Sequence, residues 1–251
     1  MHRFYLPPES CRESTLTLEG SEAHHAAQVL RVRVGERITI LDGAGHEFLC
    51  EIRNVSRKRV AMSVQQKNFT PPLPCQLTLL QAVPKGKIIE TIIQKATELG
   101  VARIVPVLSE RVTTQLDDEA AVDKLAKWHN VAIEAIKQCG QPWLPRIDPP
   151  VSPKELLTRG EKFDLPLIAS LQSDSRHPRE YFQSFFSDQK RLPRTVGIWV
   201  GPEGDFTPAE MSAIKSAGAL PISLGRLVLR CETAAIYCLS ILNYELQTSL
   251  R

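Results

Sequence analysis

The stretch TVGIWVGPEGDFTPAE, residues 195–210, decides the fold of the larger part of the chain. Its first six residues are nearly all apolar, which is typical of a strand buried in a parallel sheet. A loop with two glycines follows at 201–206. Thr207 and Glu210 then match a helix capping box, with Pro208 at the first helical position. The stretch therefore predicts a buried strand, a tight loop and a helix in succession.

The same order of strand and helix continues on both sides of this stretch, from residue 75 to the end of the chain. Residues 85–99 carry isoleucines at helical spacing, and Gly100 follows at a position that favours glycine. This alternation predicts an α/β domain with a mainly parallel sheet. Further strands are expected at 76–82, 103–108, 165–171 and 220–224, and further helices at 118–139, 178–186 and 232–247.

Short β-like segments precede this region. They end at KNFTPPLP, residues 67–74, where three prolines in four residues indicate a linker. One helix is expected at 21–30, with Ser21 as its N-cap. The pattern favours a small β-barrel domain at 1–70, followed by the α/β domain at 75–251. The strands of the β-barrel domain are expected at 3–6, 15–18, 37–41, 47–55 and 59–64.

Composition narrows the class of protein. The 251 residues are 43% hydrophobic and 24% charged with a net charge of +3, which is ordinary for a globular protein and excludes a coiled coil or a collagen. We expect no membrane span and no signal peptide, because no apolar run has the required length. The six cysteines lack the spacing of a zinc site, so we expect no metal, reduced thiols and a cytoplasmic location.

Two loops are candidates for chemistry, because ligands of open α/β sheets bind beyond the carboxyl ends of strands. The glycines at 201–206 allow close approach of the backbone to a ligand, although a tight turn would also need them. The second loop, 224–233, ends at Arg230. That arginine either pairs with Glu203 or Glu232 and ties the loops together, or it holds an anionic group beside a flat ring. Neither loop has a Walker A or dinucleotide-binding motif.

Other candidates have weaker signals. Arg57, Lys58 and Arg59 cluster around an expected turn, where charges are usually only solvated. Cys231 beside Arg230 suggests a thiol nucleophile, but no histidine is near in sequence, and a small buried side chain is the favoured interpretation.

Five blocks together resemble a known family. They are GPEG at 201–204, LGRLVLRCETA at 224–234, His24-His25 with VLR at 29–31, KATELG at 95–100, and Glu110-Arg111. In the order in which they follow one another along the chain, and over essentially its whole length, they resemble the RsmE-type ribosomal RNA uridine-N3 methyltransferases of the SPOUT superfamily.

The resemblance implies a trefoil-knotted SPOUT methyltransferase domain preceded by a PUA-like β-barrel that docks RNA. The cofactor would be S-adenosyl-L-methionine, and the active form a homodimer with its active site at the subunit interface. The substrate would be a uridine of small-subunit (16S) ribosomal RNA, methylated on N3 in the assembled or nearly assembled subunit. The alternative is a non-catalytic RNA-binding protein of ribosome assembly that has kept the fold.

The resemblance, the chemistry of methyl transfer to N3 and the clustering of basic residues together lead us to expect three sets of site residues. Catalysis would fall to Arg230, Glu203 and Glu232. The cofactor would be held by Leu171, Gly201, Pro202, Glu203, Gly204, Leu224, Gly225, Leu227, Leu229 and Thr233. RNA would be bound by His25, Arg31, Arg57, Lys58, Arg59, Lys85 and Arg111.

The sequence departs from the family pattern at two places. Asp205 stands where the family usually has a second glycine, and we expect its carboxylate to perturb the loop backbone or to repel RNA phosphate. Cys139-Gly140-Gln141 stands where the family commonly ends its long helix with an arginine. The RNA contact expected there is either missing or supplied by Arg146.

Overall fold

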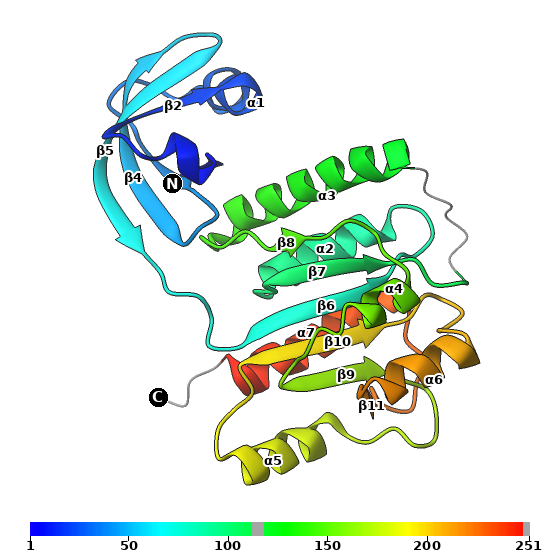
Figure 1. Ribbon diagram of the computed structural model, residues 1–251. Helices are drawn as coiled ribbons and strands as arrows, with labels where there is room; N and C mark the ends of the chain where they lie inside the picture. Colours follow the sequence, from blue (N-terminus) through cyan, green and yellow to red (C-terminus); the bar gives the residue numbers. More distant parts are fainter. Residues whose placement is uncertain (112–117, 248–251) are drawn as a thin grey trace. The chain divides into compact units, whose positions relative to one another are not determined.

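The computed structural model describes residues 1–111 and 118–247 and contains two compact units (Figure 1). The first unit comprises Met1–Pro72 with Ile133–Leu144, and the second comprises Leu73–Ala132 with Pro145–Arg251. Helix α3 (Asp118–Cys139) therefore contributes residues to both. The helix has the bounds expected from the sequence, but nothing in its pattern indicated that its last turns would pack with the N-terminal strands.

The first unit is built on a five-stranded sheet in the order β1-β3-β4-β5-β2. The first strand pairs with the third in parallel, and the remaining pairs are antiparallel. Alternating apolar residues of the strands form one core beneath two short helical turns. The strands are β1 (Arg3–Tyr5), β2 (Thr15–Glu19), β3 (Arg37–Leu41), β4 (His46–Val55) and β5 (Arg59–Phe69), and the helical segments are η1 (Pro8–Ser10), α1 (Gly20–His24) and η2 (His25–Val29).

Two expectations for this unit are wrong in detail. Glu19, not Ser21, occupies the N-cap position of the first helix. No side chain makes a capping hydrogen bond there. The helix follows β2 directly, so the last residue of the strand takes the cap position. Residues 67–69, expected in the linker, belong to β5, because Phe69 still pairs with His46 on β4. Cross-strand pairing thus carries the sheet up to the prolines themselves.

The second unit contains a six-stranded sheet in the order β11-β9-β10-β6-β7-β8, in which every pair is parallel. This confirms the expected parallel α/β architecture. Helices cover both faces (Figure 1). The strands are β6 (Gln76–Ala82), β7 (Arg103–Val107), β8 (Arg146–Ile147), β9 (Leu165–Ala169), β10 (Thr195–Val200) and β11 (Leu220–Ile222), and the helices besides α3 are α2 (Ile88–Glu98), α4 (Pro153–Thr158), α5 (Pro178–Gln189), α6 (Pro208–Ser216) and α7 (Cys231–Leu246).

Helix boundaries follow their local chemistry. Thr207 and Glu210 form the expected reciprocal capping box of α6, with Pro208 in the first turn. Helix α2 begins at Ile88, three residues later than expected, and Gly86 before it has a φ of 68°. Such a left-handed residue cannot continue a helix backwards. Gly100, after the end of α2, has a φ of 77°, as its position predicts.

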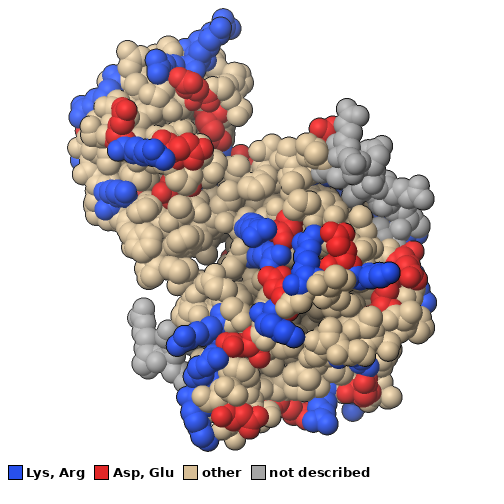
Figure 2. All heavy atoms as spheres, viewed as in Figure 1, with Lys and Arg blue, Asp and Glu red and all other residues tan. Residues whose placement is uncertain are grey.

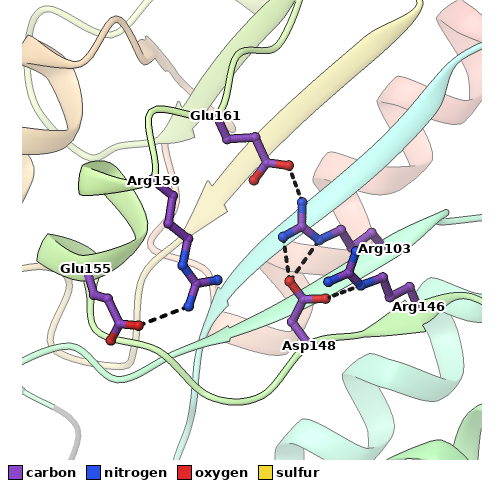
Figure 3. A network of polar contacts seen from close by, with 6 residues as sticks. All are labelled: Arg103, Arg146, Asp148, Glu155, Arg159 and Glu161. Carbon is purple, nitrogen blue, oxygen red and sulfur yellow. Dashed lines mark hydrogen bonds and ion pairs between the residues drawn. The ribbon is translucent and has the colours of Figure 1, made fainter.

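Two elements were not expected. Strand β8 has only two residues, too few for a periodic pattern. It is held at the sheet edge by the contacts of Asp148 with Arg103 and Arg146 (Figure 3). The Asp148 side chain is 1% exposed. The Asp148 carboxylate accepts a hydrogen bond from Arg103 Nε at 3.0 Å and lies 2.7 Å from Arg146 Nε. A buried carboxylate needs such partners, so the pairs fix the strand. Helix α4 is the second unexpected element.

Charges of both signs are interspersed over the viewed surface of the second unit (Figure 2). No helix in residues 1–111 and 118–247 is both long and apolar enough to span a bilayer. Within the same residues, no cluster of three or more His, Cys, Asp or Glu side chains is arranged to hold a metal ion.

Candidate active site

Three loops at the carboxyl ends of β9, β10 and β11 surround a cavity of about 240 Å³. The three strands are neighbours in the sheet, so their loops meet at one edge although they are far apart in the sequence. The walls are mostly aliphatic side chains and glycine backbone. This lining provides apolar surface for a flat ring, and free amide and carbonyl groups for polar contacts.

Nine of the ten residues expected to hold the cofactor line this cavity, and they are Leu171, Gly201, Pro202, Glu203, Gly204, Leu224, Gly225, Leu227 and Leu229. The tenth, Thr233, is exposed in the first turn of α7 and is not part of the lining. The cavity also includes Asp205, Val228 and Cys231, which had not been assigned to the cofactor. Their position beside assigned residues in the two loops was the signal that could have identified them.

The loop at 201–206 is a compact turn. Asp205 N donates to Pro202 O at 2.9 Å, and Asp205 has a φ of 60°. Glycine adopts this left-handed conformation without strain, and aspartate tolerates it better than most residues. Asp205 Oδ1 accepts a hydrogen bond from Phe206 N at 2.8 Å. A Cβ on Gly201 would lie 2.8 Å from the same oxygen, so the close packing of these two residues requires glycine at 201.

The same loop is held by neighbouring segments. Glu203 Oε1 accepts a hydrogen bond from Lys85 N at 3.2 Å. The Arg111 guanidinium donates to the carbonyl oxygen of Gly204. Lys85 and Arg111, both expected to bind RNA, thus lie against the cavity loop, because β6 and β7 end at the same sheet edge as β10.

Arg230 is exposed and occupies the N-cap position of α7. Its carbonyl oxygen accepts a hydrogen bond from Ala234 N at 2.8 Å. Within the described part of the chain, its guanidinium pairs with neither Glu203 nor Glu232. The interpretation in which this arginine only ties the two loops together is therefore wrong for this structure. Arg230 stands in the chain between Leu229 and Cys231, which both line the cavity.

Cys231 is not suited to nucleophilic chemistry. The residue is 4% exposed, and burial raises the pKa of its thiol to about 12. A hydrogen bond to Glu232 and the negative charges of Glu203 and Glu232 act in the same direction. Since the reactive species is the thiolate, the thiol is inert near neutral pH. The expected role as a small buried side chain agrees with this environment.

The residues of the first unit expected to bind RNA differ in their surroundings. Arg31, Arg57 and Lys58 are exposed, and basic side chains gather at the end of the unit where β4 turns into β5 (Figure 2). Arg59 Nε lies 3.3 Å from a carboxylate oxygen of Glu19. His25 is half-buried, with its ring packed edge-on to Phe4, the centroids 6.1 Å apart.

Two domain families match the chain. The family described as RNA methyltransferase domain matches residues 71–243, and the one described as RNA methyltransferase PUA domain matches residues 18–64. The first includes all three loops of the cavity.

Relatives match over nearly the whole length. The ribosomal RNA small subunit methyltransferase E of Bacillus subtilis is 32% identical, over 98% of this chain and 97% of the relative. A methyltransferase structure from Legionella pneumophila with the bound cofactor SAM is 34% identical, has a TM-score of 0.87 and covers 97% of both chains. The Neisseria gonorrhoeae ribosomal RNA small subunit methyltransferase E, bound to S-adenosyl methionine, is 28% identical with a TM-score of 0.84 over 98% of both chains. The chain thus belongs to the RNA methyltransferases of the ribosomal RNA small subunit methyltransferase E family.

Proposed function

We propose that the protein transfers a methyl group from S-adenosyl-L-methionine to N3 of one uridine in small-subunit (16S) ribosomal RNA. We further propose that it acts on the assembled or nearly assembled subunit. One observation carries the proposal. The cavity at the sheet edge brings together eleven residues of the two sequence blocks, 201–204 and 224–234, that mark this family. A protein that had kept only the fold would have no need to preserve this lining.

The residues present suit the proposed cofactor. Leu171, Leu224 and Leu229 offer aliphatic surface to an adenine ring. Gly225 has a φ of 110°, and a Cβ built on it would meet no atom within 4 Å, so its backbone faces open space. When bound, S-adenosyl-L-methionine supplies the methyl group on a positively charged sulfonium. The carboxylates in the lining are compatible with that charge.

The side chains around the cavity can manage the proton and charge of the uridine. N3 of uridine carries a proton that must leave, and Glu203 or Glu232 can accept it, directly or through a water molecule. The negative charge that remains spreads to O2 and O4 of the base. The unpaired Arg230 guanidinium can donate hydrogen bonds to one of these oxygens. Lys85 N keeps Glu203 beside the cavity.

The two sequence domains divide the work in this proposal. Residues 1–70 dock the RNA, with Arg31, Arg57 and Lys58 providing exposed positive charge for phosphate. Residues 75–251 carry the knotted methyltransferase fold and the chemistry. Because the proposed substrate is a ribosomal subunit, we place the protein in the cytoplasm.

A homodimer completes the proposal. Leu171, Leu227 and Val228 are 64%, 76% and 78% exposed beside the cavity, and Tyr237 on α7 is 46% exposed. The first three line the same cavity, and large apolar side chains exposed together in this way are typical of an interaction site. A second copy of the chain that covers it would close the cavity to water.

The experiment that tests the proposal uses purified protein, S-adenosyl-L-methionine and small ribosomal subunits that lack base methylation. The RNA is digested after reaction, and its nucleosides are measured by mass spectrometry. We expect 3-methyluridine to form at one site. Subunit binding without any methylated nucleoside would instead support the non-catalytic assembly protein, and a methyl group on another atom would overturn the assignment to N3.

A further inference from the structure

The cavity wall contains a charged residue that departs from the family pattern. Asp205 stands where the resemblance leads us to expect glycine, and it lines the cavity together with Glu203. These two carboxylates are the only ionisable side chains of the lining apart from the thiol of Cys231, among the residues that the structure describes. The wall is therefore acidic.

The Asp205 carboxylate is held in place. Its Oδ1 accepts the hydrogen bond from Phe206 N and sits where Gly201 leaves room. The backbone at 205 is itself tied by the bond from Asp205 N to Pro202 O. A charge on a fixed side chain acts on a ligand more strongly than one on a mobile side chain, because no ordering is needed on binding.

We propose that Asp205 makes the cofactor site selective for charge, so that it binds S-adenosyl-L-methionine more tightly than S-adenosylhomocysteine. This inference rests on the proposed function. The two molecules have nearly the same shape, but the sulfonium gives the methyl donor one more positive charge than the demethylated product. A nearby carboxylate attracts the charged form and does little for the neutral thioether. Release of the product after methyl transfer is thereby favoured.

Nearby cations do not remove this effect. The Arg111 guanidinium is bound to Gly204 O, and Arg226 and Arg230 are exposed on the other loop. Their charges are the same in the natural protein and in a variant at 205, so a comparison of the two isolates the aspartate. Across several ångströms of partly hydrated cavity, loss of one charge corresponds to about a threefold to tenfold change in affinity.

The test is isothermal titration calorimetry of the full-length protein, with S-adenosyl-L-methionine and S-adenosylhomocysteine as separate ligands. Asp205→Asn keeps an oxygen acceptor for Phe206 N and tolerates the left-handed φ, but removes the charge. We expect the Kd for the methyl donor to rise about threefold to tenfold and the Kd for the product to change less than twofold. Asp205→Gly, which suits the backbone, should behave in the same way.

Controls separate the possible outcomes. Glu155→Gln removes an exposed carboxylate of α4 outside the cavity lining and should leave both constants unchanged. An analogue with an ammonium group in place of the methylsulfonium should follow the methyl donor. Equal weakening of all ligands by Asp205→Asn, or an unchanged ratio, would overturn the inference while the proposed function stands. A natural protein that binds neither nucleoside would overturn both.

Discussion

Glu210 Oε1 accepts a hydrogen bond from Glu110 N at 2.9 Å, which joins the start of α6 to the loop after β7. The other carboxylate oxygen accepts from Thr207 N, also at 2.9 Å, and completes the capping box. Of these two bonds, only the one from Thr207 N belongs to the capping box, whose other half is the bond from Glu210 N to Thr207 Oγ1. The bond from Glu110 N is additional, and it fixes the backbone directly before Arg111, whose guanidinium reaches Gly204 in the cavity wall.

Replacing Glu210 with glutamine should destabilise the protein. The side chain is buried, and the glutamine amide has only one oxygen to accept hydrogen bonds, so one of the two backbone N–H groups loses its partner. We expect the free energy of unfolding in urea to fall by about 1–3 kcal/mol. Glu155→Gln, at an exposed side chain in the first turn of α4, is the matched control and should change the free energy of unfolding by less than about 0.5 kcal/mol. Equal effects of the two substitutions would show that accepting two backbone hydrogen bonds at Glu210, rather than one, does not stabilise the protein.

Replacing Arg111 with alanine distinguishes two roles for this residue. If the guanidinium supports the cavity loop through Gly204, affinity for S-adenosyl-L-methionine should fall by up to about tenfold, since a hydrogen bond from a charged donor is worth about 1.5 kcal/mol at the lower end of its range and this one is exposed. Affinity for small-subunit RNA should then change less than twofold, which a filter-binding assay measures. The reverse result, with weaker RNA binding and an unchanged cofactor Kd, would support the RNA contact expected from the sequence.

Much of the second unit could be predicted from local sequence signals. The capping box at Thr207, the glycine after α2 and the full extent of α3 were all expected, because each depends on residues adjacent in the chain. Helix α4 also had such a signal, in Ser152, whose hydroxyl accepts from Glu155 N at 3.2 Å, but its six residues are short for a periodic pattern. Strand β8 depends on the buried Asp148 and on a distant arginine. No local pattern could have indicated it.

The site was predictable only in part. Sequence blocks identified the loops at 201–206 and 224–230, and strand order then brought them together. Sequence blocks and strand order do not predict the direction in which an individual side chain points. Thr233 lies outside the cavity lining because α7 begins at Cys231 and its first turn sets where each side chain points. The contact between Arg111 and Gly204 joins residues from two strands' loops, which sequence spacing does not show.

Asp164 should give the protein an acid-sensitive component of stability. Hydrogen bonds from Arg191, at 2.7 and 3.0 Å, and from Arg194 N lower the pKa of its carboxyl to about 2. Because the pKa of this carboxyl is lower in the folded protein than in the unfolded chain, its ionised form stabilises the fold above about pH 4. This contribution is lost as the pH falls through 2. We expect Asp164→Asn to cost about 1 kcal/mol at pH 7, a value that allows for solvent screening, and almost nothing at pH 2.

Urea unfolding of the Asp164→Asn variant at a series of pH values measures this difference. Asp188→Asn is a suitable control, because Asp188 is exposed near the end of α5 and has no ion-pair partner among the described residues. The prediction would be contradicted if the natural protein and the Asp164 variant differed in free energy of unfolding by the same amount at pH 7 and at pH 2.

The basic turn between β4 and β5 should contribute to RNA binding by charge alone. Arg57→Ala with Lys58→Ala removes two exposed cations, so the slope of log affinity against log salt should become shallower by about 1.5. Arg53→Ala is the control, because that guanidinium is already 2.7 Å from Glu51 and less available to phosphate. The measurement is small-subunit RNA binding at several salt concentrations. An unchanged slope in the double variant would exclude the turn from the interface.

Replacing Arg230 should separate cofactor binding from catalysis. Its guanidinium has no partner among the described residues, and Arg230 is not part of the cavity lining, so Arg230→Ala should leave the Kd for S-adenosyl-L-methionine within twofold of the natural value. The rate of uridine methylation should fall by about 100-fold to 1000-fold, because the charge that develops on the base loses a positioned donor.

Single-turnover methylation with saturating cofactor measures this rate directly. Arg230→Lys keeps the charge but not the planar fork of donors, so it should recover only a small part of the activity. Arg226→Ala removes an exposed arginine from the same loop and should retain most of it. A rate for Arg230→Ala within a few-fold of the natural protein would exclude the arginine from catalysis. Equal losses at 226 and 230 would instead indicate that the loop acts through its overall positive charge, as a contact to RNA phosphate would.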